Sequence, residues 1–144
     1  MKSSVLQVWL QSPQLNGHNG LHIDNNKNKL IVASLGPLSK PGGGIEIIDI
    51  KNKTISSLGT EGTTSPFGGL DGTESDATKI PYCVTDNPAG KVYDVNADEI
   101  GYQTLIDLHT KGAANLGSIP YQDQSTIIIP LMQYNKLIAF TLVQ

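Results

Sequence analysis

The length, charge and hydropathy of the chain favour one globular domain that binds neither nucleic acid nor a membrane. It has 144 residues, the size of one ordinary domain. Charged residues make up only 16% of them, the net charge is −3 and there is no basic run, which argues against nucleic acid as a partner. No apolar stretch approaches the roughly 20 residues needed to span a membrane. The single cysteine, Cys83, excludes an intrachain disulfide and gives no zinc or redox spacing.

The first residues do not have the pattern of a signal peptide. Residues 1–4 are followed by a short apolar run at 5–10, which Gln7 interrupts. We therefore expect a cytoplasmic protein if the chain is complete, and a periplasmic or secreted protein if a leader has been removed.

Fifteen glycines and eight prolines punctuate the chain, which favours many short strands over a few long helices. Residues 5–10 (VLQVWL) are β-branched and aromatic enough to form a first strand. Three groups of expected strands follow. They are 21–24, 30–34, 45–50 and 54–58; then 71–75, 82–85, 91–95 and 102–108; then 116–121, 126–131 and 136–143. No window has the 3.6-residue period of a long helix, so the sequence predicts an all-β chain.

A polar residue stands at the start of each group. Asn19, Asp71 and Asn115 each lie eleven residues before a β-rich run. They are 52 and 44 residues apart, and a period of 40 to 50 residues with short strands is the signature of propeller blades. We therefore predict three four-stranded antiparallel blades, half a β-propeller, in a single domain over residues 1–144. The blades span about 19–58, 71–108 and 115–143. An ordinary β-sandwich with a coincidental repeat is the alternative.

The third group is one strand short of four, and residues 5–10 form an extra strand before the first group. Three blades of one chain cannot close a ring of four to eight blades, whereas two chains can form a six-bladed ring. In that ring, residues 5–10 of each chain would complete the last blade of the other and cover exposed sheet edges. We therefore predict a homodimer with N-terminal strand exchange.

The longer connections, rich in Gly, Pro and aromatic residues, lead into each blade or join its second and third strands. In an up-and-down blade both kinds emerge on one face, and long loops on a rigid scaffold are where binding residues usually lie. Asn19, Asp71 and Asn115 begin the innermost strands on that face, so we expect their side chains beside the central channel. His18 and His109 lie in the connections that lead into blades, which makes them candidate contacts for a small-molecule substrate.

Two stretches of the chain have the pattern of a known family. Residues 19–21 (NGL) followed by 30–33 (LIVA) resemble the NGL…D…LYVAD segment of the regucalcin/gluconolactonase family of six-bladed propellers. Residues 70–72 (LDG), 82–86 (YCVTD) and 90–93 (GKVY) resemble the segment that follows it in that family. The resemblance covers nearly the whole chain, but about half of a family member.

The resemblance implies a metal site. In that family the matching Asn and Asp coordinate a catalytic divalent cation, which assigns Asn19 and Asp71 to the metal and makes Asp71 the candidate general base. Asn115 falls at the equivalent turn of the next blade. The family's metal-binding Glu comes from a first blade that this chain does not contain, so a partner would have to supply it. Two copies of each residue in a dimer would provide carboxylate and amide oxygens, which suit Ca²⁺ and suit zinc poorly.

We therefore expect a metal-dependent hydrolase of lactones or esters, with Ca²⁺ as the cofactor. The metal would polarise the substrate carbonyl, and Asp71 or a bound water would start the attack. The alternative is a non-catalytic propeller module that binds a ligand or a metal, or an assembly fragment of a larger propeller. The Asn and Asp residues favour the hydrolase, and the missing Glu favours the module.

Overall fold

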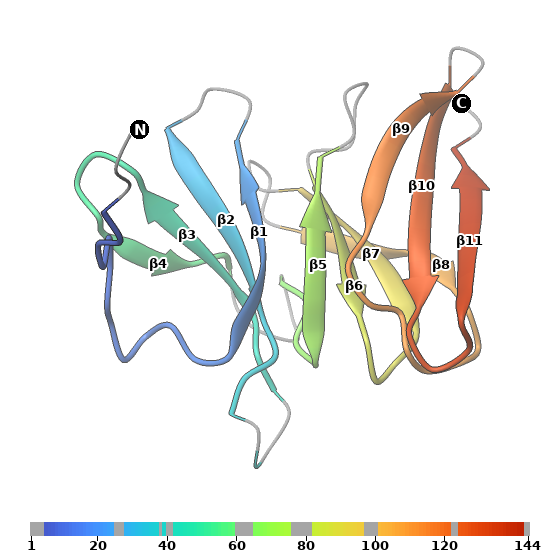
Figure 1. The fold of residues 1–144 in the computed structure, drawn as a ribbon, viewed down its shortest axis with the longest axis horizontal. Coiled ribbons are helices and arrows are strands. Elements are labelled where there is room, and N and C mark those ends of the chain that lie inside the picture. The colour runs from blue at the N-terminus through green and yellow to red at the C-terminus, as the bar shows by residue number, and fades with distance from the viewer. Residues whose placement is uncertain are drawn as a thin grey trace.

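The strands of the chain form three antiparallel sheets that stand side by side (Figure 1). The computed structural model describes residues 5–24, 28–37, 39, 42–59, 65–75, 82–96, 101–121 and 124–142. These residues contain eleven strands and no helix, which confirms the all-β prediction. Within the same ranges there is accordingly no helix that is long and apolar enough to cross a membrane.

Each sheet is a meander of strands that are consecutive in the chain. The first sheet contains β1 (His18–Ile23), β2 (Lys29–Ser34), β3 (Ile45–Asp49) and β4 (Ile55–Ser57); the second contains β5 (Leu70–Glu74), β6 (Tyr82–Asp86), β7 (Lys91–Asn96) and β8 (Gly101–Asp107); the third contains β9 (Gly117–Tyr121), β10 (Gln124–Leu131) and β11 (Lys136–Thr141). All eleven overlap the strands predicted in the three groups. The described part of the third sheet has three strands where the others have four, as the sequence predicted.

Residues 5–10 do not form a strand in the single chain. This described segment has no sheet partner, and the side chains of Val5 and Leu6 are 75% and 100% exposed. The Nζ of Lys53 donates to the carbonyl oxygen of Trp9 at 2.9 Å and lies 5.5 Å from the centre of its ring. The segment therefore rests on the turn between β3 and β4. A strand needs an unpaired sheet edge for its backbone groups, and a turn does not offer one.

The hydrophobic core consists of two layers, one between each pair of neighbouring sheets. The first layer joins Ile31 and Ala33 of β2 to Val84 of β6. The second joins Cys83 of β6 to Ile127 of β10 and its neighbours. Successive residues of a strand point to opposite faces, so β6 contributes to both layers and is buried along its whole length.

The first strands of the three sheets, β1, β5 and β9, are preceded by the same backbone hydrogen bond, and this bond shows which residues are equivalent. The same backbone hydrogen bond closes each first hairpin, from Leu35 N to Gly17 O at 2.8 Å, from Asn87 N to Gly69 O at 3.0 Å and from Met132 N to Gly112 O at 3.1 Å. Two residues after each of these glycines stand Asn19, Asp71 and Ala114. The assignment of Asn115 to this level is therefore off by one residue.

The error in the third repeat comes from the length of its hairpin. The pairs that open the first hairpins are His18 with Ser34, Leu70 with Asp86 and Ala113 with Leu131. The last of these hairpins is two residues longer than the other two. A constant spacing of eleven residues therefore selects the correct residue in the first two sheets and the wrong one in the third.

Candidate functional site

Asp71 lies in a β-bulge that is held from inside the second sheet. Just before Thr73, β5 has one residue more than its partner strand β6. The N–H of Gly72, within this bulge, donates to Oγ1 of Thr85 at 2.7 Å, and Thr85 is completely buried. The bulge leaves the N–H of Gly72 without a partner in the ladder of backbone hydrogen bonds, and Thr85 provides one. The bond also fixes the backbone next to Asp71.

Asn19 occupies the equivalent bulge of β1 and reaches Asp71 across the gap between the first two sheets. Its Nδ2 donates to Oδ1 of Asp71 at 3.0 Å. The two strands approach closely because residue 20 is glycine, and a Cβ there would collide with the carbonyl oxygen of Asp71. The structure thus brings together two of the three polar residues that the repeat singled out.

Asn87, in the turn between β6 and β7, completes the surroundings of Asp71. Its Nδ2 donates to Oδ2 of Asp71 at 3.4 Å, so each carboxylate oxygen faces one amide group. A comparison of the three repeats in the sequence could have singled out Asn87. The residues equivalent to Asn87 in the other two sheets are Leu35 and Met132, and both are apolar.

The surroundings of Asp71 disfavour its charge. Burial raises the pKa of the Asp71 carboxyl above its ordinary value, and the hydrogen bond from Asn87 opposes this with a smaller effect. A carboxylate in this state gains from any cation that replaces its lost hydration.

Asn115 lies beside the site without bonding to Asp71. Its Oδ1 accepts the N–H of Leu116 at 3.0 Å. The same oxygen would lie 2.6 Å from a Cβ built on Gly72, so it is adjacent to the residue after Asp71. Asn115 is exposed, and its amide can rotate toward the site only by giving up the bond to Leu116.

Neither candidate histidine forms a hydrogen bond or ion pair with Asp71 among the described residues. His18 is exposed at the start of β1, and the hydrogen bonds to the Asp71 carboxylate within the described chain come from Asn19 and Asn87. His109 has a φ of 51°, and its side chain is 86% exposed. Its Nδ1 lies 3.3 Å from Oδ1 of Asp107, so its nearest charged partner is in its own turn.

The donors around Asp71 suit Ca²⁺ in their chemistry. Within the described ranges no three side chains of His, Cys, Asp or Glu come together as a metal cluster. The available ligands would be the Asp71 carboxylate and the amide oxygens of Asn19 and Asn87, which are hard oxygen ligands but reach the site only when each amide turns over, because its NH₂ group faces Asp71 in this structure. Because Ca²⁺ takes six to eight oxygens, water or a second copy of the chain would have to supply the others.

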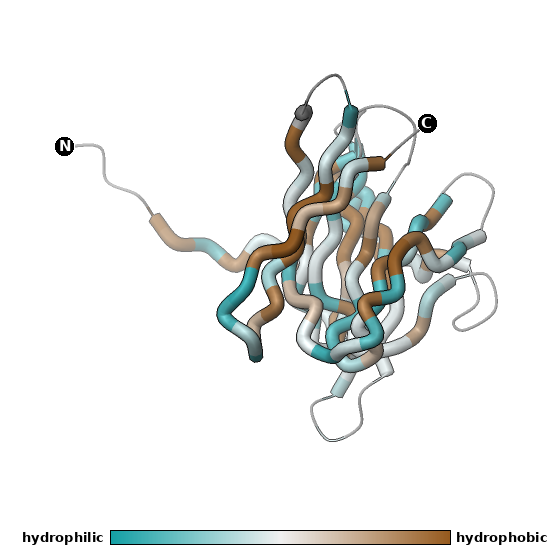
Figure 2. The backbone as a smooth tube through the Cα atoms, turned by 90° about the vertical axis from the view of Figure 1, so that its right-hand side faces the viewer, coloured by the Kyte–Doolittle hydropathy of each residue, from teal (hydrophilic) through white to brown (hydrophobic). Residues whose placement is uncertain are grey.

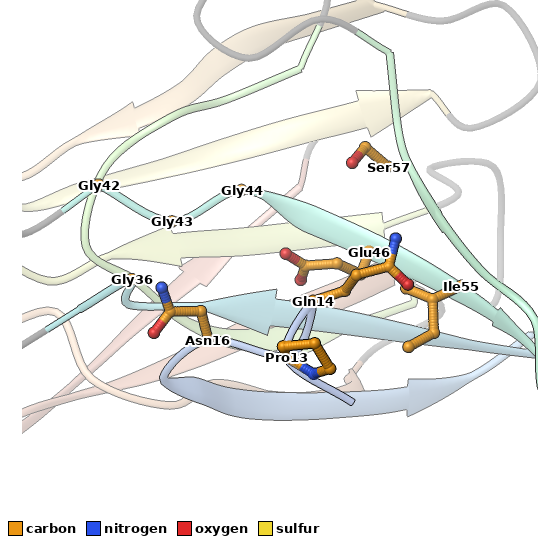
Figure 3. A pocket seen from close by; sticks show the side chains of 10 residues that line it. All are labelled: Pro13, Gln14, Asn16, Gly36, Gly42, Gly43, Gly44, Glu46, Ile55 and Ser57. Carbon is orange, nitrogen blue, oxygen red and sulfur yellow. The ribbon is translucent and has the colours of Figure 1, made fainter. Parts of the chain in front are cut away.

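A cavity of about 310 Å³ lies elsewhere, on the first sheet (Figure 3). It lies between Gln14 and Asn16 of the segment before β1 and residues of the sheet that include Glu46. The Glu46 carboxylate accepts a hydrogen bond from Ser34 Oγ at 2.6 Å. Neither Asp71 nor its amide donors line this cavity, so it is distinct from the candidate site.

We predict that Thr85→Val weakens the fold by about 2 kcal/mol, because a buried N–H of Gly72 then loses its acceptor while the shape of the side chain is kept. Thr104→Val is the matched control, because Thr104 is exposed on β8 and should change the free energy of unfolding by less than about 0.5 kcal/mol. Urea unfolding of the two variants measures both values. Equal losses would show that the hydrogen bond to Gly72 does not stabilise the bulge.

No protein-family model matches the chain. Over 110 residues, which are 75% of the chain, its sequence is 29% identical to leucine-rich repeat-containing protein egg-6 of Caenorhabditis elegans. The chain spans 11% of the length of this relative. The likeness is therefore to a small part of that protein.

Proposed function

We propose that the chain binds a divalent cation, Ca²⁺ in preference to others, at a site centred on Asp71. The observation that carries this proposal is the convergence of two amide side chains from different strands on one half-buried carboxylate. Both amides face the carboxylate with their NH₂ groups, and a half-turn of each would present its carbonyl oxygen, which is the ligand type that Ca²⁺ prefers. In this proposal Asn19 and Asp71 supply the core of the site, and Asn115, whose side chain lies beside Gly72, is a further candidate ligand.

Calorimetric titration of the intact protein with CaCl₂ tests the site. We expect saturable binding at or below millimolar Ca²⁺, and a rise of the melting temperature with Ca²⁺ that EGTA reverses, because a ligand of the folded state stabilises it by mass action. Absence of binding at millimolar metal would remove the cation from the proposal and leave a scaffold without metal.

A second candidate function is hydrolysis of lactones or esters. The specific observation in its favour is the raised pKa of Asp71, which makes this carboxylate a better general base than an exposed one. A bound cation would supply polarisation of the substrate carbonyl. Asp71 would accept the proton of an attacking water, and His18 and His109 are proposed to contact the small-molecule substrate from the loops. Screening lactones and aryl esters with and without chelator distinguishes this enzyme from a module that binds a ligand or metal without hydrolysing a substrate.

We also propose that two copies close a six-bladed ring. The outer faces of the first and third sheets are apolar although no neighbouring sheet covers them in the described chain. Leu21 and Ile23 on β1 are 60% and 44% exposed, and Ile119 on β9 and Leu137 on β11 are 44% and 72% exposed. These faces correspond to the faces that pack together in the two core layers, so the outer face of one copy fits the opposite face of another.

The edges of the sheets support the same closure. The segment 5–10 lies beside the first sheet, and β11 forms the free edge of the described third sheet at the other end of the molecule (Figure 1). Figure 2 shows the segment before β1 extending away from the sheets. Because it lies at the opposite end of the molecule from β11 of its own chain, we propose that it pairs with β11 of the second copy.

Light scattering at micromolar concentration should give twice the monomer mass. Leu137→Arg places a charge on the outer face of β11 and should convert the protein to monomers, because an unpaired charge is costly to bury in an apolar seam. Thr104→Arg, on the exposed face of β8, should leave the mass unchanged. Removal of residues 1–10 should weaken the assembly. A stable wild-type monomer would exclude ring closure by a second copy.

A further inference from the structure

We propose that Asn87 is a direct oxygen ligand of the cation at Asp71, an inference that rests on the cation-binding function proposed above. The turn that contains Asn87 lies between β6 and β7, and the side chain reaches a carboxylate 16 residues away in the sequence.

The backbone of Asn87 is fixed by the loops on both sides of it. Its N–H donates to Gly69 O at 3.0 Å, in the loop that leads into the second sheet. Its carbonyl oxygen accepts the N–H of Gly112 at 2.9 Å, in the loop that leads into the third. A residue held by two neighbouring segments presents its side chain in one place, which is what a preorganised ligand requires.

The fold itself does not require an amide at this position. The equivalent residues, Leu35 and Met132, make the same backbone hydrogen bond with apolar side chains. The side-chain amide of Asn87 is half-buried, and the hydrogen bond that it donates goes to Asp71. The amide of Asn87 therefore serves the Asp71 carboxylate, and the hairpin does not need it.

An amide can serve both states of such a site. Without a cation, the NH₂ groups of Asn19 and Asn87 face the two oxygens of Asp71 and partly replace its lost hydration. A half-turn of each amide presents its carbonyl oxygen in place of the NH₂ group, and the oxygen is a ligand for Ca²⁺. Cation binding would then exchange two N–H donors for two oxygen ligands with the backbone unchanged.

Two substitutions of the same residue test this role, because they are expected to act in opposite directions. Asn87→Ala removes one ligand and should weaken Ca²⁺ binding by about tenfold. Asn87→Asp replaces an amide oxygen by a carboxylate and should strengthen Ca²⁺ binding, because affinity rises with the charge of the ligands. The same variant should melt at a lower temperature in EGTA, because two carboxylates then face each other without a cation.

Asn16→Ala and Asn16→Asp are the matched controls, since Asn16 lines the separate cavity on the first sheet and is exposed. Both should bind Ca²⁺ as the wild type does. Calorimetry with CaCl₂ and thermal unfolding in EGTA provide the readouts. If the wild type binds and Asn87→Ala binds equally well, or Asn87→Asp binds more weakly, the role of Asn87 is refuted and the site at Asp71 stands without it. If the wild type does not bind Ca²⁺, the proposed function fails and this inference fails with it.

Discussion

We expect Gly20→Ala to lower the free energy of unfolding by about 3 kcal/mol. A Cβ at this position would overlap the carbonyl oxygen of Asp71 and would lie 2.8 Å from the backbone N of Thr73. Both are main-chain atoms of an inner strand, so they cannot move aside as a side chain would. Relief of the overlap requires β1 and β5 to separate, which opens the first core layer and breaks the bond between Asn19 and Asp71.

Gly101→Ala is the control for this experiment. A Cβ on Gly101, at the start of β8, meets nothing within 4 Å. Alanine in a strand loses less conformational freedom on folding than glycine, so the control should be neutral or slightly stabilising, within about 1 kcal/mol. Urea unfolding followed by tryptophan fluorescence or circular dichroism compares the two variants. A Gly20→Ala protein as stable as the control would contradict the close contact of the inner strands.

The second large effect is expected from Asp71→Asn, which should weaken Ca²⁺ binding by more than about tenfold. The substitution keeps the size of the side chain and removes the carboxylate. The oxygen of the new amide can still accept the N–H of Asn19. If the Asn87 amide turns over, its oxygen can accept a hydrogen bond from the NH₂ group of the new amide. The fold should therefore persist, and calorimetry with CaCl₂ isolates the contribution of the charge. Unchanged affinity would place the cation elsewhere.

The same variant should be more stable than the wild type in EGTA at neutral pH, by about 1 kcal/mol or less. Burial raises the pKa of Asp71 in the folded chain, so the folded chain holds this proton to a higher pH than the unfolded chain does. The stability that the proton contributes is present below the ordinary pKa of 3.8 and is lost as the pH rises through the raised folded value. The side chain of Asp71→Asn does not titrate, so the variant does not lose this stability as the pH rises. Melting temperatures of the two proteins, measured from acid to neutral pH, test this prediction. If the variant's advantage in melting temperature is smaller at neutral pH than in acid, the prediction is contradicted.

The strands could be predicted from the sequence because each alternates or concentrates β-branched residues between turns rich in Gly, Pro and Asn. Strand β10, with its run of isoleucines, and strand β6, buried on both faces, are examples. The segment 5–10 has the same composition and yet is not a strand in the single chain. Composition shows that a segment can pair, but the partner edge depends on where the chain runs in space.

The candidate site was predictable only as far as the repeat was regular. The repeat gives Asn19 and Asp71 equivalent positions because their hairpins have equal length, and it places Asn115 one residue off because the hairpin of β9 and β10 is two residues longer. Asn87 was missed because its side chain acts through a contact between strands, while its sequence neighbours are those of an ordinary turn. Contacts of this kind follow from tertiary packing and have no local pattern.

The meander order of the sheets has a consequence for the way the chain folds. Each of the eleven described strands pairs only with its neighbours in the chain, so each sheet can form by closing short loops. The core layers between sheets join residues such as Ile31 and Val84, which are 53 positions apart, and they cost more loop entropy to assemble. Folding therefore resembles that of a short linear array, in which each unit gains most of its stability from the interface with the next. The middle sheet has two such interfaces, and we expect it to be the last to open.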